Sequence, residues 1–455
     1  MAPFKVIIVG GGLSGSLLAN GLVNNGVEVT IYERDSADSK REGYQIRLGE
    51  AAETGFKACL SDDVRAAIHA KFGRSSKAVN SAPTVCNSRF ETVIDLTKLP
   101  NYSKSFAINR VVLRDILLEP IKRAGRVRYQ KKLDRYDIIL DERGNERVQV
   151  QFSDGTTDVC DILVGADGSG SAINRQVGLR NIVEVNTHMV VLNKGSLTQD
   201  IINKLPARLR AGPVLTFKGD IHFFFALYLP SAGGQSSKAD EQSEYDLGQG
   251  SFYWGLTIGR ERFPHEGTSK IPDLLEFCLE QIKDWAPEYR AMLTVGEQTG
   301  ERDSLILVPL RASNKPSKQW RQDVKKRQVA DNTQGHPRVW LIGDAVHAMQ
   351  PNRGMGGNQA MQDCADILPE LLRLSKTAES GTPVSSQDIE LAVKRYEDKM
   401  IDRAFTWVKK SSGTSVPGID LDGILGTLVK FCGSLVWLVT SCASLLLGFS
   451  KVKQS

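Results

Sequence analysis

The pattern of apolar residues at the start of the chain indicates a strand, a helix and a second strand. Val6–Val9 is a continuous run of β-branched residues, as expected for a buried parallel strand. Helical periodicity follows over Leu13–Asn24, and Val27–Tyr32 forms a second apolar run. This order predicts a βαβ unit of an α/β fold, in which the two strands are parallel.

Residues much further along the chain carry the same kind of signal. Short buried strands are expected at Asp161–Val164 and Val339–Ile342, and helices at Asn109–Ala124, Gln359–Leu372 and Glu390–Lys410. We therefore expect a discontinuous α/β domain, with one part on each side of the middle of the chain.

The middle of the chain has a different pattern, in which aromatic and β-branched residues dominate. Its strand-like segments are Val214–Phe217, His222–Leu229 and Phe252–Ile258. The sequence therefore predicts a β-rich domain at residues 181–300, inserted between residues 1–180 and 301–415 of the α/β domain. Residues 416–455 form a separate apolar C-terminal segment.

A glycine motif joins the first strand to the first helix. Gly10, Gly12 and Gly15 satisfy G-x-G-x-x-G, in which the first glycine permits a tight turn, the second lets the backbone approach a pyrophosphate, and the third allows close packing of the helix. Glu33 ends the second strand, where its carboxylate can accept hydrogen bonds from ribose hydroxyls and disfavours a 2′-phosphate. The motif predicts a dinucleotide site without separating FAD from NAD.

Two later segments resemble the signatures of a known family of flavoenzymes. They are residues 164–175, VGADGSGSAINR, and residues 343–360, GDAVHAMQPNRGMGGNQA. With the glycine motif, in this order and spacing, they resemble the class A flavin monooxygenases, which include aromatic hydroxylases and squalene- and zeaxanthin-type epoxidases. The resemblance extends from Lys5 to about Lys410. It implies a Rossmann-like FAD-binding domain of the glutathione-reductase type, an inserted β-rich substrate domain and a C-terminal helical tail.

The resemblance also implies the chemistry. NAD(P)H would reduce FAD, O₂ would add to the flavin C4a atom, and the resulting hydroperoxide would transfer one oxygen atom to the substrate. Only one complete dinucleotide motif is present, so we expect the nicotinamide donor to dock transiently and leave.

Five residues of the second signature are expected at the flavin. By the resemblance, Asp344 binds the ribityl chain or the ribose–phosphate region of FAD, and Pro351 lies near the reactive flavin edge. Gly356, Gly357 and Asn358 open a helix whose N–H groups can face the pyrimidine edge, where negative charge accumulates on reduction.

Three further residues are expected to bind the cofactor. Asp167 lies in the signature that the family links to FAD and nicotinamide, and Arg110 matches an R-x-x-L arginine that reaches FAD from a helix. Arg47 matches a flavin-contacting loop more weakly, and the alternative is a surface arginine. His347 is expected to support the architecture of its loop rather than to take part in catalysis.

The middle domain carries the candidate catalytic residues. Some relatives use the arginine of a Gly-Arg-x-x-Leu segment as an acid or anchor, whereas here Lys194 stands at that position. Epoxidation of an alkene needs no phenolate activation and can proceed without that arginine. Tyr228 and Tyr253 are candidate proton donors. Aromatic side chains, most of them expected in the core, imply an apolar or aromatic substrate: Phe217, Phe223, Phe224, Phe225, Tyr228, Phe252, Tyr253 and Trp254.

Composition argues against several other kinds of protein. The net charge of +5 comes without a clustered basic stripe, so nucleic-acid binding is not expected. The seven cysteines include no C-x-x-C and the six histidines show no ligand spacing. We therefore expect reduced thiols, a cytosol-facing protein and no metal site.

The last part of the chain is apolar. Residues 424–449 contain one charge, Lys430, and Phe431–Phe449 contains none. At about 1.5 Å per residue, a helix over Phe431–Phe449 nearly crosses a hydrocarbon core of about 30 Å. We expect either an anchor in the endoplasmic reticulum membrane of a eukaryotic source, with the catalytic part in the cytosol, or a helix packed on the folded domain. The apolar end resembles that of fungal epoxidases of polyketide and terpenoid pathways.

Three functions remain open. The first is an FAD-dependent monooxygenase that epoxidises or hydroxylates an apolar secondary metabolite, such as a polyketide polyene, a terpenoid or an indole. The second is a soluble aromatic ring hydroxylase of the salicylate type. The third is a flavin-binding scaffold without turnover, which the intact Asp344–Asn358 segment disfavours.

Overall fold

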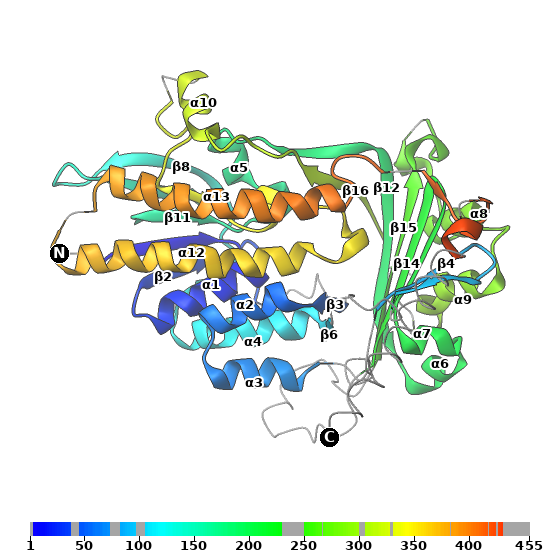
Figure 1. Cartoon of the computed structure of the whole chain (residues 1–455). Helices are drawn as coiled ribbons and strands as arrows, with labels where there is room; N and C mark the ends of the chain where they lie inside the picture. Colours follow the sequence, from blue (N-terminus) through cyan, green and yellow to red (C-terminus); the bar gives the residue numbers. More distant parts are fainter. Residues whose placement is uncertain are drawn as a thin grey trace, which may run out of the picture.

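A β-rich part stands beside an α/β part in the computed structural model of the chain (Figure 1). The structure describes residues 3–37, 45–72, 82–96, 105–229, 250–265, 267–299, 305–327, 331–382, 384–416, 418–424 and 426–430.

A five-stranded parallel sheet forms the centre of the α/β part, with the strand order β17-β11-β1-β2-β7. Val6, Ile7 and Ile8 are fully buried, as a central strand with both faces covered requires. Strands predicted at the two ends of the chain therefore meet in one sheet. Its members are β1 (Lys5–Val9), β2 (Glu28–Tyr32), β7 (Val127–Arg128), β11 (Ile162–Gly165) and β17 (Val339–Leu341).

Helices from both ends of the chain surround this sheet. The long ones are α1 (Leu13–Asn24), α2 (Glu50–Cys59), α4 (Arg110–Arg123), α12 (Gly356–Glu379) and α13 (Ser386–Lys410). α12 packs against α1, α2 and α13, so it connects the two parts of the domain. Ser385 and Asp388 form a capping box that begins α13. The shorter helices are α3 (Asp62–Ala70), α5 (Ala172–Gln176), α10 (Trp320–Arg327) and α11 (Asp344–His347).

Two small antiparallel sheets complete the α/β part. One has the order β10-β9-β8, and the Phe152 ring of β9 packs 4.3 Å from the Tyr32 ring. The other pairs β3 with β6 and contacts β14 and β15 of the large sheet. This β3–β6 pair therefore lies where the two parts of the molecule meet. The strands are β3 (Gln45–Leu48), β6 (Phe106–Asn109), β8 (Leu133–Leu140), β9 (Glu146–Phe152) and β10 (Thr157–Cys160).

The β-rich part is built on a large sheet with the order β16-β12-β15-β14-β13-β4-β5, in which β18 also pairs with β13. Its strands are β4 (Thr84–Cys86), β5 (Thr92–Asp95), β12 (Ile182–Leu197), β13 (Val214–Gly219), β14 (Ile221–Tyr228), β15 (Gly250–Gly259), β16 (Ile306–Ser313) and β18 (Ile419–Asp420). Four helices accompany it: α6 (Gln199–Lys204), α7 (Ala207–Ala211), α8 (Leu274–Gln281) and α9 (Pro287–Leu293).

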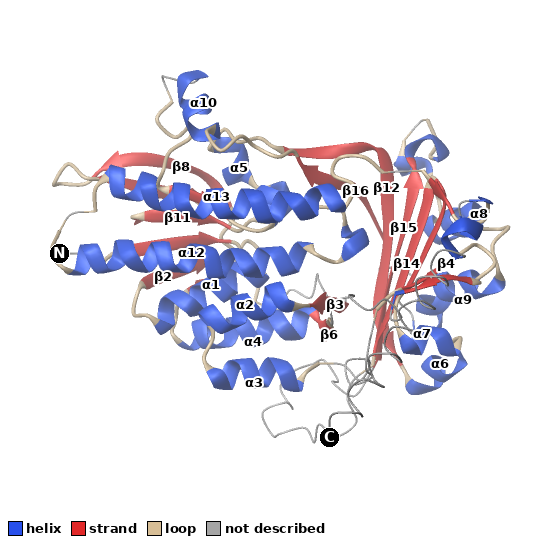
Figure 2. Ribbon diagram, viewed as in Figure 1, coloured by secondary structure: helices blue, strands red, loops and turns tan. Residues whose placement is uncertain are grey.

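The two faces of the large sheet have different neighbours. Phe223, Phe225 and Trp254 are buried with apolar residues of α8 and α9 in one core cluster. Phe224 and Tyr253, which alternate with them along β14 and β15, are half-buried on the opposite face. Figure 2 shows the helices on the side of this sheet that is away from the α/β part. The face of Phe224 and Tyr253 is therefore the one turned towards the α/β part.

The predicted fold class is confirmed, but several segments lie in a different part from the predicted one. Residues of β4, β5 and β16 were assigned by sequence to the α/β domain, and residues of β18 to the tail, yet all four strands join the large sheet. Local periodicity marks a strand but does not identify its partner, which here lies far away in the chain.

Only the beginning of the predicted apolar tail is described. Residues 424 and 426–430 are helical, and residues 431–455, which contain most of the predicted membrane segment, lie outside the described residues. Among the described residues, none of the helices combines the length and the apolarity that a bilayer span requires.

Candidate active site

The loop between β1 and α1 has the backbone geometry of a pyrophosphate cradle. Gly10 has a φ of +110°, and a Cβ atom there would lie 2.3 Å from the Ala166 carbonyl oxygen. A Cβ on Gly15 would lie 2.0 Å from the Gly10 carbonyl oxygen, so the helix can approach the loop only with glycine at that position. By contrast, no atom of the described residues lies within 4 Å of a Cβ built on Gly12. Gly12 thus leaves open the space that a bound phosphate needs.

The carboxylate of Glu33 is engaged with the backbone beside this loop. Its Oε2 atom accepts a hydrogen bond from the Gly11 N–H at 2.7 Å, and its Oε1 atom accepts one from the Asp35 N–H at 3.0 Å. Glu33 is buried, so these bonds fix the position of the glycine loop relative to β2. The predicted contact of Glu33 with a ribose stays a prediction.

Arg114 supports the same loop and was missed in the sequence. Its Nε donates to the Gly11 carbonyl oxygen at 3.0 Å, and its guanidinium lies 3.8 Å from the Glu33 carboxylate. Arg114 follows the predicted Arg110 by four residues, so both lie on the same side of α4. The sequence does contain a signal for Arg114: it is a charged residue one turn beyond Arg110 on the same predicted helix.

Asp167 lies against the glycine loop at the end of β11. Its Oδ2 atom accepts a hydrogen bond from the Ala172 N–H at 2.8 Å. Its Oδ1 atom is buried and has no hydrogen-bond partner in the described part of the chain. Burial raises the pKa of this carboxyl above its usual value. A buried acceptor without a partner is costly unless a ligand donor reaches it, which fits a hydroxyl group of a bound dinucleotide.

The second signature forms a turn that faces the start of α12. Gly343 has a φ of +61°, and the Asp344 side chain that follows is exposed. A Cβ on Gly356 would lie 3.7 Å from Asp344 Oδ1, and one on Gly357 would meet no described atom within 4 Å. The N-terminus of a 24-residue helix is thus open beside a carboxylate. Its free N–H groups can stabilise negative charge on a reduced flavin.

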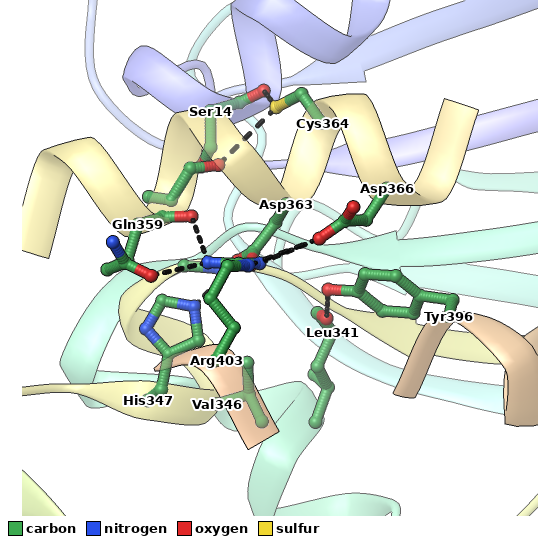
Figure 3. A network of polar contacts seen from close by, with 12 residues as sticks. Ser14, Leu341, Val346, His347, Gln359, Asp363, Cys364, Asp366, Tyr396 and Arg403 are labelled. Atoms are coloured by element: carbon green, nitrogen blue, oxygen red, sulfur yellow. Dashed lines mark hydrogen bonds and ion pairs between the residues drawn. The ribbon is translucent and has the colours of Figure 1, made fainter. Parts of the chain in front are cut away.

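A buried ionic network of side chains from α11, α12 and α13 holds this turn in place (Figure 3). Asp363 Oδ2 accepts hydrogen bonds from the Gly343 N–H at 2.8 Å and from His347 Nε2 at 2.6 Å. Asp363 Oδ1 accepts from Arg403 Nη2 at 2.6 Å. Burial alone would raise the pKa of Asp363, but His347, Arg403 and the Gly343 N–H hold it below its ordinary value. His347 is fully buried in this network and so has the structural position that was expected for it.

Asn358 connects the start of α12 to the β3–β6 pair. Its Oδ1 atom accepts from the Gly49 N–H at 2.7 Å, and its Nδ2 atom donates to the carbonyl oxygens of Arg47 and Gly354. The Asn358 side chain thus connects neighbouring loops. Only the backbone of Asn358 belongs to the open N-terminus of α12. The Arg47 side chain donates to Ser105 next to β6. Cofactor contacts of Asn358 and Arg47 stay predictions.

Arg110 and Pro351 both stand at the first position of a helical turn. Arg110 begins α4, whose N-terminus is capped by the Asn109 side chain. Pro351 begins the short 3₁₀ turn Pro351–Arg353 that leads into Gly354 and α12. The turn places Pro351 between the buried network and the open end of α12. The roles predicted for the two residues are compatible with these positions and stay predictions.

The catalytic candidates of the middle domain lie on one face of the large sheet, but the hydroxyl of Tyr228 has a partner of its own. Lys194 of β12 lies directly opposite Tyr253 of β15, so both stand on the sheet face turned towards the α/β part. Tyr228 is buried, and its hydroxyl donates to the Lys71 carbonyl oxygen at 3.0 Å. Burial also raises the Tyr228 pKa. The structure thus brings Lys194 and Tyr253 together, whereas the Tyr228 hydroxyl is held by the backbone of the α/β part.

The fold and the site define a flavoprotein whose α/β part offers a dinucleotide cradle beside a β-rich substrate domain. The model of the FAD binding domain family matches residues 3–204 and 306–382, more than half of the chain, so the chain belongs to this family. The resemblance to the class A FAD-dependent monooxygenases is confirmed, and FAD is the cofactor.

Curated relatives cover most of this chain. FAD-dependent monooxygenase tazP of Aspergillus terreus is 25% identical over 408 residues, which are 84% of this chain and 94% of the relative. The dual O-methyltransferase/FAD-dependent monooxygenase elcB of Phaeosphaeria nodorum is 25% identical over 431 residues, 89% of this chain and 45% of the relative. The chloroplastic zeaxanthin epoxidase of Nicotiana plumbaginifolia is 24% identical over 400 residues, 86% of this chain and 52% of the relative. The chain thus spans about half the length of the last two.

Solved structures share the fold. A putative FAD containing monooxygenase from Photorhabdus luminescens subsp. laumondii superposes with a TM-score of 0.66 at 22% identity, over 90% of this chain and 96% of that one. HpxO of Klebsiella pneumoniae, solved with FAD and uric acid, has a TM-score of 0.60 at 18% identity, over 90% of this chain and 87% of that one.

Proposed function

We propose that this chain uses NAD(P)H and O₂ to insert one oxygen atom into an apolar secondary metabolite, such as a polyene, a terpenoid or an indole. FAD, when bound, supplies the activation of O₂, and the protein has to place the substrate and exclude water. The observation that carries the proposal is the half-buried aromatic face of the large sheet, which is turned towards the FAD-binding part.

The composition of this face favours an apolar substrate. Phe224 and Tyr253 lie side by side with their ring centroids 5.9 Å apart, and Leu192 precedes Lys194 by two residues on the same face of β12. Such surfaces bind ligands mainly through apolar contact, with a few polar groups that set the orientation. Lys194 and Tyr253 bring polar groups to this face beside the Phe224 ring.

Epoxidation is favoured over hydroxylation of a phenol by the residue at position 194. Relatives that use an arginine there hold or protonate a polar group, and this chain has Lys194 instead. An alkene carries no acidic group that must be ionised or held, so it reacts without such an anchor. Lys194 and Tyr253 can still donate a hydrogen bond to the oxygen of the product.

We also propose that the catalytic part faces the cytosol and that residues 424–449 associate with a membrane such as the endoplasmic reticulum. The support is the sequence, in which Lys430 is the single charge of that segment. Membrane fractionation of the full chain against a chain ending at residue 423 tests this: equal recovery in the soluble fraction contradicts it.

A panel assay tests the proposed function. FAD-loaded protein is mixed with NADH or NADPH and with polyenes and terpenoids such as β-ionone, indoles, naphthols, and salicylate. We expect an apolar member to accelerate NAD(P)H oxidation at least about tenfold and to gain one oxygen atom by mass spectrometry. Turnover of salicylate alone would establish the ring hydroxylase instead, and no turnover of any panel member would contradict oxygenation of this class of substrate.

A further inference from the structure

After α13 the chain returns to the large sheet. Residues 411–416 and 418–422, called the strap below, run from the end of α13 to β18 and Asp422. In Figure 1 this orange-to-red segment passes beside β16 and β12. The strap lies beyond the part of the chain that the family model matches, which ends at residue 382.

The first part of the strap is held by the loop that carries Pro351. The buried Gln350 side chain donates from Nε2 to the carbonyl oxygens of Gly413, at 2.9 Å, and Ser415, at 2.7 Å. Arg353, on the other side of Pro351, donates to the Lys410 carbonyl oxygen at 2.7 Å. Gln350 therefore binds the strap itself, and Arg353 binds the last residue of α13, directly before the strap.

The second part of the strap is fixed to the large sheet at β13. Ile419 and Asp420 of β18 pair with β13, and the Leu421 N–H donates to the Phe217 carbonyl oxygen at 3.2 Å. The Asp422 carboxylate accepts from the Ser88 N–H at 2.8 Å and from the Ser88 hydroxyl. The carboxylate is also 3.2 Å from Lys218 Nζ.

Between these two attachments, the strap contacts the substrate face. Val416 packs against a buried cluster that includes Val190 of β12 and Leu310 of β16, and Leu192 and Val308 pack against the same cluster. Val190 is paired with Val308, and Leu192 precedes Lys194 by two residues, so all of them lie on the sheet face of Lys194. Val416 therefore adds an apolar side chain to the face that the proposed substrate would contact.

We propose that the strap is a wall of the substrate site, with Val416 as a specificity-determining residue and Gln350 as a positioning residue. The inference rests on the proposed function for the identity of the ligand, but the position of the wall stands on contacts alone. Gln350 couples the wall to the loop of Pro351, which leads into α12. A displacement of Val416 is therefore transmitted through Gln350 to the loop of Pro351.

Two variants and one control separate this proposal from a merely structural strap. Gln350→Ala removes both bonds to the strap, and Val416→Ala removes the apolar contact with the sheet. Thr414→Ala is the control, because the Thr414 side chain is exposed on the same segment. FAD-loaded full-length proteins are compared by hydrogen–deuterium exchange and by kinetics with β-ionone and 2-naphthol as probes.

We expect both variants, and not the control, to exchange faster at residues 350–356 and 411–422. Val416→Ala should raise the KM of the probe that is turned over about fivefold, with kcat changed less than about twofold, because a wall contact adds uniform binding. Gln350→Ala should also produce more H₂O₂ per NAD(P)H consumed.

Failure of this proposal is distinguishable from failure of the proposed function. If both variants exchange at the same rate as Thr414→Ala, the proposal that the strap is a wall of the site is refuted, whatever the activity of the wild type. An active wild type whose probe KM is unchanged by Val416→Ala overturns the specificity role. A wild type that oxidises no NAD(P)H with any substrate refutes the monooxygenase, and the exchange pattern then still decides the position of the wall.

Discussion

The substitution Asp363→Asn should release the Gly343–Asp344 turn and weaken FAD binding. Asp363 is fully buried and accepts three hydrogen bonds, from the Gly343 N–H, His347 and Arg403. An asparagine of the same shape has one oxygen and one NH₂ group. If the NH₂ faces Arg403, two donors oppose each other, and if it faces Gly343, the N–H of the turn loses its acceptor.

The expected loss of stability follows from the burial of Asp363 and of its hydrogen-bond partners. Removal of one member of a buried ion pair costs about 3–5 kcal/mol. Arg403 retains its bonds to Asp366 and its side chain is 23% exposed, so the low end, about 3 kcal/mol, is expected. At an unfolding entropy of about 2.1 cal/mol/K per residue, the loss corresponds to a decrease in Tm of about 3 °C for a chain of this size.

Asp366→Asn is the matched control for this substitution. Asp366 lies one turn further along α12, also bonds Arg403, and is 18% exposed, so its replacement should cost about 1 kcal/mol or less. Differential scanning fluorimetry of the apo and FAD-loaded proteins measures stability, and flavin fluorescence measures the FAD dissociation constant. Equal effects of Asp363→Asn and Asp366→Asn on Tm and on FAD affinity would refute the assigned role of the network.

Three further substitutions test other parts of the molecule. Gly15→Ala forces a Cβ to 2.0 Å from the Gly10 carbonyl oxygen, so the purified protein should lose its flavin absorbance and about 1–3 kcal/mol of stability; retained flavin would contradict the cradle. Burial lowers the pKa of His336 below its usual value although Glu146 lies 3.5 Å away, so the unfolded chain binds the proton first, and stability should fall as the pH drops below about 6.5. Urea unfolding of His336→Gln should lack that part of the pH dependence, and an unchanged profile would assign it to other groups. Asp422→Asn should cost about 1 kcal/mol and speed proteolysis after α13, because the anchor to Ser88 weakens, and an unchanged cleavage rate would contradict the anchor.

Local signals were sufficient to predict the framework of the fold and most of the cofactor loop. β1, α1 and β2 match the predicted segments closely, because buried parallel strands are short β-branched runs and the glycine motif marks the start of the helix between them. Gly10, Gly12 and Gly15 were assignable individually because each meets a different steric requirement of the same turn.

Contacts between distant segments could not be predicted from the sequence. β4 and β18 are short strands separated by more than three hundred residues, and they attach to the same strand, β13. Arg114 and Arg403 look like ordinary charged residues of amphipathic helices until the helices are placed, when they prove to bind Gly11 and Asp363. A partner so remote is selected by the global packing and leaves no local pattern.

The candidate catalytic residues illustrate the same limit. Lys194 was found through its position in a motif, and the pairing of β12 with β15 then placed it opposite Tyr253. Tyr228 had an equal claim as a proton donor by residue type, but its hydroxyl bonds to the Lys71 carbonyl oxygen in another part of the molecule. Residue type indicates what a side chain can do, and only the fold determines what it contacts.

Isotope labelling tests most directly that the chain is an oxygen-inserting enzyme. FAD-loaded full-length protein is supplied with NAD(P)H and ¹⁸O₂ and with the panel compound that most accelerates NAD(P)H oxidation, and the product is analysed by mass spectrometry. We expect one ¹⁸O atom in each product molecule, and no label when ¹⁸O is supplied as water. Consumption of NAD(P)H that yields only H₂O₂, or a product oxygen that derives from water, would contradict the monooxygenase function.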